Sequence, residues 1–351
     1  MRKQIDRLYI TLTNQCNMRC PHCWISAGEA HDERKIEFRE YKNVIDSLLN
    51  YGLKTIKVTG GEPLIKKDLV KSLLAYCNEK SLSFNVETNG LLIDDEYLEL
   101  FKNAKDIELG LSLDFPNDMH DSFRKFPDAF NIIKNVLIKL NKNNISNSVV
   151  MTVHKGNYHF MEQLADLVIG EFGGTFVKYL VCRESGRAET EMLNELLNPS
   201  EIINFYKEVI RIAHKYPKKI TAMIPTAFQE IDSELIVGTC DFDKIISVLP
   251  DGSIALCGIG INNPETVLGK ISVDSISNIV ENNMLLEKIR SQNKVYTGVC
   301  GVCIFNKVCA NICPASSYSS YNTYFGPYPI CQKLYEAGLF PQEYVIGEAA
   351  V

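Results

Sequence analysis

Hydrophobic and polar positions alternate with a period of two in six short stretches between Arg7 and about Tyr216. In the first stretch, Leu8, Ile10 and Leu12 alternate with polar or amphipathic residues, which is the pattern of a half-buried β-strand. The predicted strands are residues 7–13, 54–59, 82–88, 105–113, 147–153 and 174–182.

Helical periodicity fills the intervals between these strands. Apolar residues recur at helical spacing at Phe38, Tyr41, Val44, Ile45, Leu48 and Leu49, and again at Phe130, Ile133, Val136, Leu137 and Leu140. Gly52 is predicted to end the first helix, and Pro199-Ser200 to begin a later one. Six strand–helix units predict an α/β fold in which outer helices cover a parallel sheet. Because the strands are short and β-branched, we expect a partial (β/α)6 barrel with its chemistry at the carboxyl ends of the strands.

The alternation of strands and helices stops after Tyr216, and a cysteine-rich part follows. We therefore predict a first domain at 1–220, a linker at 221–238 and a small second domain at 239–351. Within the second domain, Pro250-Asp251-Gly252 predicts the turn of a β-hairpin.

Composition narrows the function classes. The chain has 351 residues, of which 46% are hydrophobic, so it can bury a sizeable core. We find neither a run near the ~18–20 apolar residues of a membrane span nor a signal peptide, and we expect a cytoplasmic protein without a membrane partner. The net charge of −6 comes from well-mixed signs, which argues against nucleic acid as a partner.

Twelve cysteines in a chain without an export signal favour metal ligation over disulfides. Cys16, Cys20 and Cys23 lie within eight residues, spaced C-x3-C-x2-C, directly after the first predicted strand. Three thiolates suit a [4Fe–4S] cluster that keeps one iron open. A closed zinc site would need a fourth ligand. The nearest candidate is His22, but it lies between Cys20 and Cys23 in the sequence, where chelation would be strained. Cys77 lies on an apolar helix face and is predicted to be a core residue.

The C-x3-C-x2-C stretch resembles the motif of the radical S-adenosylmethionine (SAM) enzymes. The resemblance implies that SAM chelates the open iron and that one electron from the cluster cleaves SAM. The resulting 5′-deoxyadenosyl radical would abstract a hydrogen atom from the substrate. His22 fits the family position that lies near the adenine.

Polar motifs follow the other predicted strands. Gly60, Gly61, Glu62 and Pro63 end the second strand and resemble the family loop that binds the amino group of SAM. Further SAM-binding positions implied by the resemblance are Glu87, Asn89, Ser112, Asp114, Asn157 and Arg187. Turn chemistry explains any one of these motifs equally well, and a surface salt bridge explains Arg187.

Two features near these motifs carry no assigned function. Phe115 stands where relatives usually have Gly, so substrate identity does not carry over through that loop. Four further histidines show no metal-binding spacing and are predicted to lie on the surface or in loops: His31, His154, His159 and His214.

A second set of cysteines resembles the seven-cysteine SPASM extension of radical SAM enzymes that modify peptides. Its members are Cys240, Cys257, Cys300, Cys303, Cys309, Cys313 and Cys331. The resemblance implies two auxiliary [4Fe–4S] clusters, hence three clusters in all. Cys300, Cys303, Cys309 and Cys331 would hold the distal one, and Cys240, Cys257 and Cys313 the proximal one. A zinc ribbon is the alternative, although seven ligands suit closed tetrahedral sites poorly.

The fourth ligand of the proximal cluster is left open by the sequence. Asp241 or Asp243 would supply oxygen, and Cys182 would supply a thiolate from the end of the sixth strand. The remaining alternative is an open iron that binds a thiolate of the substrate.

The leading functional prediction is radical modification of a ribosomally made precursor peptide, with formation of a thioether or carbon–carbon cross-link. The alternatives are a sulfatase-maturating enzyme that makes formylglycine, an enzyme that oxidises a small-molecule alcohol, and a non-catalytic iron–sulfur electron carrier. Sulfatase-maturating relatives usually carry a further cysteine that residues 241–256 lack. Expected partners are a peptide or protein substrate and a flavodoxin- or ferredoxin-type electron donor. Because about six residues precede the first strand, a substrate with a leader would require a separate recognition protein or the barrel surface.

Overall fold

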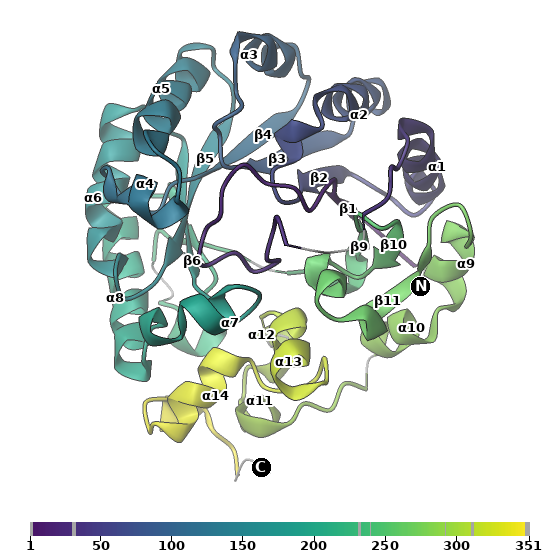
Figure 1. The fold of residues 1–351 in the computed structure, drawn as a ribbon. Helices are drawn as coiled ribbons and strands as arrows, with labels where there is room; N and C mark the ends of the chain where they lie inside the picture. Colours follow the sequence, from purple (N-terminus) through teal and green to yellow (C-terminus); the bar gives the residue numbers. More distant parts are fainter. Residues whose placement is uncertain are drawn as a thin grey trace. The chain divides into compact units, whose positions relative to one another are not determined.

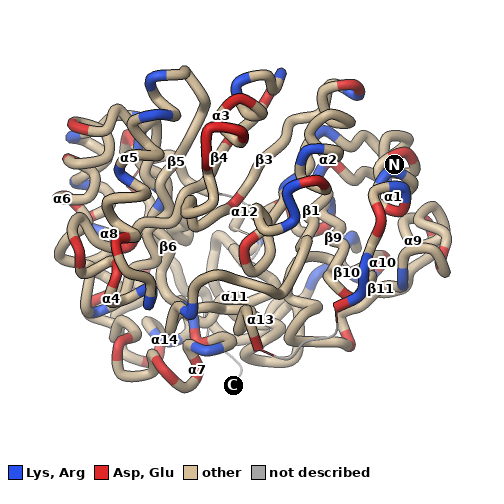
Figure 2. The backbone as a smooth tube through the Cα atoms, turned by 45° about the horizontal axis from the view of Figure 1, so that its top comes forward, with Lys and Arg blue, Asp and Glu red and all other residues tan. Residues whose placement is uncertain are grey.

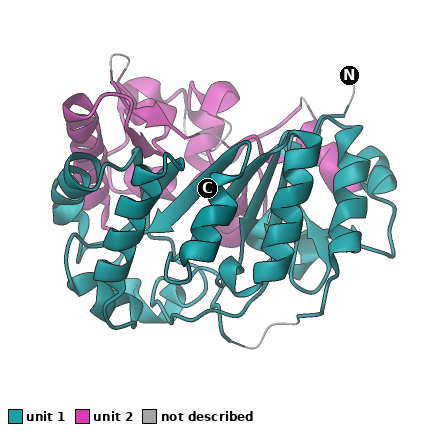
Figure 3. Ribbon diagram, turned by 90° about the horizontal axis from the view of Figure 1, so that it is seen from above, with its two compact units in different colours: residues 1–196, 243–283 teal, residues 197–242, 284–351 magenta. Residues whose placement is uncertain are grey.

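The computed structural model describes residues 3–29, 33–230, 233–238, 240–291, 293–309 and 312–347. The chain divides into two compact units, each built from two stretches of sequence (Figure 3). Unit 1 contains residues 1–196 and 243–283, and unit 2 contains residues 197–242 and 284–351.

Unit 1 is organised around a sheet in the order β11-β10-β9-β1-β2-β3-β4-β5-β6 (Figure 1). Each strand from β1 to β6 pairs in parallel with the next. These strands are β1 Arg7–Thr11, β2 Thr55–Thr59, β3 Ser83–Thr88, β4 Ile107–Ser112, β5 Asn147–Val153 and β6 Phe176–Val181. The predicted α/β fold with a parallel sheet is confirmed.

Helices alternate with these strands along the chain, and several of them cover the outer side of the curved sheet (Figure 1). They are α1 Phe38–Leu49, α2 Lys67–Lys80, α3 Asp95–Lys102, α4 Met119–Arg124, α5 Ala129–Lys142, α6 Met161–Ala165 and α7 Ala188–Glu191. At the start of α1, Glu37 and Glu40 form a capping box that satisfies backbone N–H groups. After α1 the chain turns at Gly52, whose φ of 89° suits a residue without a side chain.

The predicted hairpin around Pro250-Asp251-Gly252 is present, but it belongs to unit 1. Its strands β9 Ile245–Val248 and β10 Ser253–Ala255 are antiparallel, and β9 also pairs in parallel with β1. β11 Val267–Lys270 and α9 Ile276–Asn282 complete this part. The periodicity of the sequence gave no sign that β9 pairs with β1. Because of this pairing, residues 243–283 belong to unit 1, and the compact units do not follow the predicted domain limits. Those limits stay a prediction.

Unit 2 is mainly helical. Its elements are α8 Pro199–Lys215, β7 Ile220–Ala222, β8 Ile236–Val237, α10 Met284–Arg290, α11 Gly298–Val302, α12 Asn306–Cys309, α13 Pro314–Tyr321 and α14 Pro329–Glu336. Asn198 and Glu201 form a capping box at the predicted start of α8. α14 contacts α8, α11 and α13.

Two further observations concern membrane insertion and the distribution of charge. Within the described residues, none of the helices combines the length and apolarity that a membrane crossing requires. Basic and acidic residues are interspersed along the chain (Figure 2).

The two faces of the sheet in unit 1 differ in polarity. One face is fully buried and apolar, as Leu8, Val58 and Leu109 illustrate. The other face carries charged side chains, among them Lys57 on β2 and Glu87 on β3, whose Nζ and Oε1 atoms lie 2.7 Å apart. The carboxyl ends of β1 to β6 meet at one edge of this sheet, where most of the predicted site residues lie.

Candidate active site

The cysteine loop, residues 12–29, leaves the carboxyl end of β1 and contains Cys16, Cys20 and Cys23. The backbone N–H groups of Met18 and Ala27 donate hydrogen bonds to Cys16 Sγ and Cys23 Sγ, at 3.4 and 3.3 Å. Such donors stabilise a thiolate more than a thiol. The donor set therefore fits an iron–sulfur cluster.

Without a metal, the thiols of Cys16 and Cys20 resist ionisation. Burial raises the pKa of Cys16, and it raises the pKa of Cys20 to about 11. Among the described residues, no three His, Cys, Asp or Glu side chains already converge as a metal site. The positive charge of bound iron would have to remove the thiol protons as the cluster enters.

The glycine loop, residues 60–62, lies directly against the backbone of the cysteine loop. Gly61 N–H donates to Thr13 O at 2.7 Å, and Glu62 N–H donates to Gln15 O at 2.8 Å. A Cβ at position 61 would lie 2.1 Å from Gln15 O, and one at position 60 would lie 2.7 Å from Thr13 O. Both glycines are therefore required by the close approach of the two backbones.

Glu62 joins the glycine loop to the end of β3. Its carboxylate accepts hydrogen bonds from Leu64 N–H, Thr88 Oγ1 and Asn89 N–H at 2.7–3.0 Å. Burial raises the pKa of Glu62 to about 7, although these three donors oppose the shift. Asn89 continues the chain of contacts, because its Nδ2 donates to Asn17 Oδ1 in the cysteine loop at 2.7 Å. The ends of β1, β2 and β3 are thus connected by polar contacts.

A buried ion pair connects β4 with α4. Arg124 Nε donates to Asp114 Oδ2 at 2.6 Å, and Asp114 Oδ1 accepts from Thr152 N–H at 2.9 Å. Burial would raise the pKa of Asp114, but Arg124, with His22 and His120, holds it well below its usual range. Asn157 is fully buried, and its Nδ2 donates to Asp114 O at 3.1 Å. This network fixes the ends of β4 and β5.

His22 lies next to this ion pair. Its Nε2 is 3.5 Å from Arg124 Nη2, which leaves Nε2 as the acceptor and Nδ1 as the protonated nitrogen. Burial lowers the pKa of His22 to about 3, so the ring is neutral. Among the described residues, Nδ1 is buried without a hydrogen-bond partner. An unsatisfied buried donor beside the cysteines fits a ligand with an acceptor atom.

Arg187 contacts the cysteine loop rather than a free carboxylate. Its Nε donates to Cys20 O at 2.9 Å and its Nη1 to Ala27 O at 2.7 Å, while Nη1 also lies 3.1 Å from Glu29 Oε1. The side chain is almost fully buried. Arg187 therefore holds two carbonyls of the loop in place, and its predicted contact with SAM stays a prediction.

Glu87 and Ser112 lie on the polar face of the sheet. Lys57 and Lys178 lower the pKa of Glu87 against the effect of burial. A Cβ at Gly110 on β4 would lie 2.4 Å from Glu87 Oε2, so this glycine makes room for the carboxylate. Ser112 ends β4 as predicted. The predicted contacts of Glu87 and Ser112 with SAM stay predictions.

A stack of aromatic rings beside the site was missed by sequence reasoning. Phe123 on α4 lies between His22 and His154, with ring centroids 4.9 and 4.7 Å away. Phe115 packs edge-on against both Phe123 and His154. His154 lies in the loop after β5, as one of the two predicted alternatives has it, but it is buried in this stack and not on the surface.

Three other histidines and two cysteines can be placed briefly. His159 and His214 are exposed, as predicted, and His31 lies outside the described residues. Cys77 is fully buried, which confirms it as a core residue. Cys182 is buried against Ala188 and Met192.

Five of the remaining cysteines lie in the C-terminal part of unit 2. They are Cys300 in α11, Cys303 after it, Cys309 at the end of α12, Cys313 before α13 and Cys331 in α14. Burial raises the pKa of Cys331 well above its usual range, and the charges of Cys300, Cys309 and Cys303 add to the shift. The four cysteines predicted to hold the distal cluster are therefore electrostatic neighbours. Their role as ligands stays a prediction.

The three cysteines predicted to hold the proximal cluster are divided between the units. Cys257 follows β10 in unit 1, whereas Cys240 and Cys313 belong to unit 2. Their common role stays a prediction as well.

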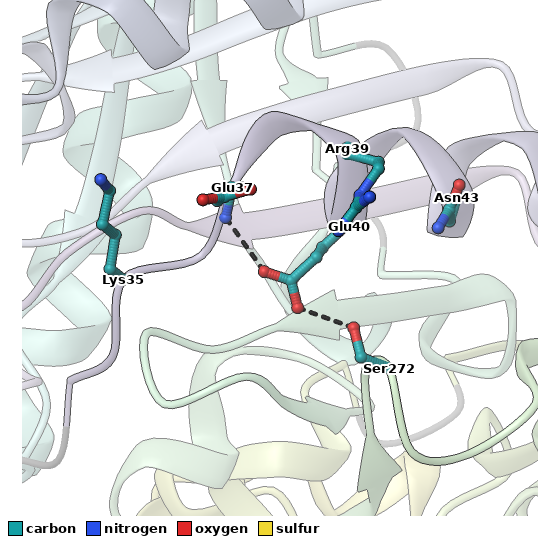
Figure 4. A pocket seen from close by; sticks show the side chains of 6 residues that line it. All are labelled: Lys35, Glu37, Arg39, Glu40, Asn43 and Ser272. Atoms are coloured by element: carbon teal, nitrogen blue, oxygen red, sulfur yellow. Dashed lines mark hydrogen bonds between the residues drawn. The ribbon is translucent and has the colours of Figure 1, made fainter.

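The pocket shown in Figure 4 is separate from the predicted site residues. It has a volume of about 590 Å³ and is lined by Lys35, Glu37, Arg39, Glu40, Asn43 and Ser272. Glu40 accepts hydrogen bonds from Glu37 N–H and Ser272 Oγ, as the dashed lines show. Hydrogen bonds from Arg34, with those from Ser272 and Glu37, lower the pKa of Glu40 to about 2 despite some burial. The Glu40 carboxylate is thus satisfied by groups of the protein, and we assign the pocket no ligand.

Comparison with known proteins gives a family match for the N-terminal part of the chain. Residues 10–168 match the model of the Radical SAM superfamily. The AdoMet-dependent heme synthase of Methanosarcina barkeri is 25% identical over 339 residues, which cover 91% of this chain and 94% of the relative. The Fe-coproporphyrin III synthase of the same organism is 32% identical over 157 residues, which cover 45% of this chain and only 39% of that relative. The antilisterial bacteriocin subtilosin biosynthesis protein AlbA of Bacillus subtilis is 28% identical over 281 residues, covering 79% of this chain and 60% of AlbA.

Solved structures show the same fold. Streptococcus suis SuiB bound to precursor peptide SuiA has a TM-score of 0.74 at 15% identity, covering 94% of this chain and 76% of SuiB. The protein anSMEcpe with bound AdoMet and Cp18Cys peptide has a TM-score of 0.71 at 19% identity, covering 95% of each chain. At these identities the likeness is one of fold alone.

Proposed function

We propose, on the premise that residues 10–168 carry a Radical SAM superfamily domain, that this chain is a radical SAM enzyme that modifies a peptide. The observation that carries the proposal is the cysteine loop. It presents three thiols beside a buried, unsatisfied His22 nitrogen and is fixed by the glycine loop. An iron–sulfur electron carrier would need neither the unsatisfied His22 nitrogen nor the glycine loop.

The protein residues have distinct roles in this proposal. Cys16, Cys20 and Cys23 would hold a [4Fe–4S] cluster, and the glycine loop would bind the amino group of SAM. When bound, the cluster and SAM together supply the radical that removes a hydrogen atom from the substrate. Arg187 and Glu62 orient the two loops through hydrogen bonds to backbone groups. Phe123 covers one face of the His22 ring, and Phe115 packs against Phe123 in turn.

A peptide substrate is supported by the nature of two similar proteins. AlbA is a bacteriocin biosynthesis protein, and SuiB has been crystallised with a precursor peptide. The electrostatic neighbours Cys300, Cys303, Cys309 and Cys331 support an auxiliary cluster in unit 2. We propose three [4Fe–4S] clusters in all, or about twelve irons per chain. The reaction would form a thioether or carbon–carbon cross-link and would draw on a flavodoxin- or ferredoxin-type donor in the cytoplasm.

The fourth iron of the proximal cluster is proposed to bind a thiolate of the peptide. Cys182 is the alternative ligand from unit 1, but its thiol is packed among apolar side chains, and burial raises its pKa to about 12. Binding a substrate cysteine to iron would remove its proton, as a thioether-forming reaction requires.

A second candidate function is favoured by one specific observation. Two relatives that match over at least 90% of their length are AdoMet-dependent heme synthases, whereas the match to AlbA covers 60% of that protein. A tetrapyrrole precursor of heme would then replace the peptide as substrate, and Fe-coproporphyrin III, the compound named for another relative, is a tetrapyrrole to test. Anaerobic incubation with SAM, dithionite and Fe-coproporphyrin III, followed by chromatography of the pigments, separates the two candidates.

Reductive cleavage of SAM tests the proposal shared by both candidates. The anaerobically reconstituted, dithionite-reduced chain should release 5′-deoxyadenosine from SAM, and replacing Cys16, Cys20 and Cys23 with Ala should abolish it. Cys77→Ala is the matched control, because it removes a buried thiol that we assign to the core. Reductive cleavage that survives the triple replacement would refute the assignment of these cysteines.

A further inference from the structure

Trp24, the residue that follows Cys23, is held by two other segments of unit 1. Its carbonyl oxygen accepts hydrogen bonds from Asn262 Nδ2 at 2.8 Å and from Ser185 Oγ at 3.3 Å. The backbone beside it is equally confined, because a Cβ at Gly186 would lie 2.6 Å from the carbonyl carbon of Trp24. The part of the cysteine loop around Trp24 is therefore fixed in position by segments that are distant in sequence.

The indole of Trp24 packs against the segment that follows Cys257. A Cβ at Gly258 would lie 2.4 Å from Cη2 of the ring, so the indole rests directly on the Gly258 backbone. Gly258 begins the short 3-10 helix Gly258–Ile261, and Asn262 ends it, so both contacts of Trp24 in this part of the chain belong to one turn. The indole is nevertheless 44% exposed, so hydrophobic burial alone does not account for its position.

This contact joins two loops to which we assign different clusters. Cys23 precedes Trp24 and belongs to the radical cluster, and Cys257 precedes Gly258 and belongs to the proximal auxiliary cluster. Each cysteine is thus one residue away from the same contact. A displacement of the Gly258 backbone toward the ring would have to move the indole, because the two are already in contact.

We propose that Trp24 is a positioning residue that seats the Cys257 loop on the cysteine loop, so that cluster binding at Cys257 depends on the indole. This inference rests on the proposed function for the identity of the clusters, whereas the contact itself does not. The ring acts as a spacer: it fills the distance between Gly258 and the end of the cysteine loop, and the Asn262 hydrogen bond fixes its backbone.

The chain provides its own probe, because Trp24 is its single tryptophan. Gly258→Ala adds one methyl group against the ring, and the φ of Gly258 lies outside the left-handed region, so the variant introduces no backbone strain there. The far end of the indole is the part that must move. Gly170→Ala is the matched control, since a Cβ there meets nothing within 4 Å.

The experiment compares the full-length, anaerobically reconstituted wild-type protein with Gly258→Ala and Gly170→Ala. It also includes Trp24→Phe and Trp24→Ala. Asn262→Ala is added because it removes a hydrogen bond without adding volume. We expect a red shift of the Trp24 emission and a loss of bound iron in Gly258→Ala, and a smaller change of the same sign in Asn262→Ala. Gly170→Ala should behave as the wild type. Trp24→Ala should lose iron, and Trp24→Phe should retain more of it.

Two results would overturn the inference. An unchanged emission spectrum in both Gly258→Ala and Asn262→Ala would show that the contact is absent, and a shifted spectrum with unchanged iron would show that the contact does not control cluster binding. The proposed function fails separately, if the wild-type protein forms no 5′-deoxyadenosine from SAM while its emission responds as expected.

Discussion

Gly61→Ala tests the contact between the glycine loop and the cysteine loop. The added Cβ would lie 2.1 Å from Gln15 O and 2.9 Å from Asn14 O, where ordinary contact begins at 3.4 Å. Both neighbours are backbone atoms, so relief requires the loops to separate by about 1.3 Å, the difference between 3.4 and 2.1 Å. Separation weakens the hydrogen bonds from Gly61 N–H to Thr13 O and from Glu62 N–H to Gln15 O.

The expected loss of SAM affinity follows from the overpacking by the added Cβ and from the two weakened hydrogen bonds. Overpacking typically costs about 1–3 kcal/mol, and each hydrogen bond contributes about 0.5–1.5 kcal/mol. If about 1.4 kcal/mol of the total falls on the geometry that binds SAM, the affinity for SAM decreases about tenfold. Calorimetric titration of the reconstituted protein with SAM measures this decrease, and the rate of 5′-deoxyadenosine formation should fall with it. Gly170→Ala is the control in open space. Wild-type affinity for SAM in Gly61→Ala, with the iron content intact, would refute the role of the contact.

Two further predictions concern buried charges. Glu62 has a folded-state pKa of about 7, raised mainly by burial from an ordinary value of 4.5, so its contribution to stability is present below pH 4.5 and is lost as the pH rises through about 7. Urea unfolding should therefore show a smaller loss of stability between about pH 5 and about pH 8 in Glu62→Gln than in the wild type, and equal losses would contradict the assignment. Arg124→Met should lower the free energy of unfolding by about 3–5 kcal/mol, because it leaves the Asp114 carboxylate buried and unpaired. Arg19→Met breaks the solvent-exposed pair with Glu191 and should change the stability far less, so equal effects of the two variants would argue against a buried ion pair.

The strands of unit 1 could be predicted because their information is local. Alternation in Arg7–Thr11 and in the five strands that follow reflects one buried face, and that pattern is visible in any short window. The positions of the cysteine and glycine loops followed from the same rule, since both come directly after a strand. The capping boxes at α1 and α8 likewise involve residues three positions apart.

The parts that could not be predicted depend on contacts between distant segments. The pairing of β9 with β1 joins residues separated by more than two hundred positions, and neither strand carries a mark of its partner. His154 is buried because Phe115 and Phe123 from another loop and helix surround it. Arg124 sits on a short helix, and only the fold brings its guanidinium to Asp114. The sequence shows that Phe115, in the loop of Asp114, stands where relatives usually have Gly. It does not show that Phe115 packs against His154.

We expect SAM to bind to an open iron held by Cys16, Cys20 and Cys23. Electron paramagnetic resonance of the dithionite-reduced, reconstituted protein, recorded with and without SAM, measures this binding. SAM should change the spectrum of one cluster, and this cluster and its response should disappear together in the Cys16→Ala, Cys20→Ala, Cys23→Ala protein. A reduced cluster on these three cysteines whose spectrum is unaffected by saturating SAM would show that SAM does not bind to its iron.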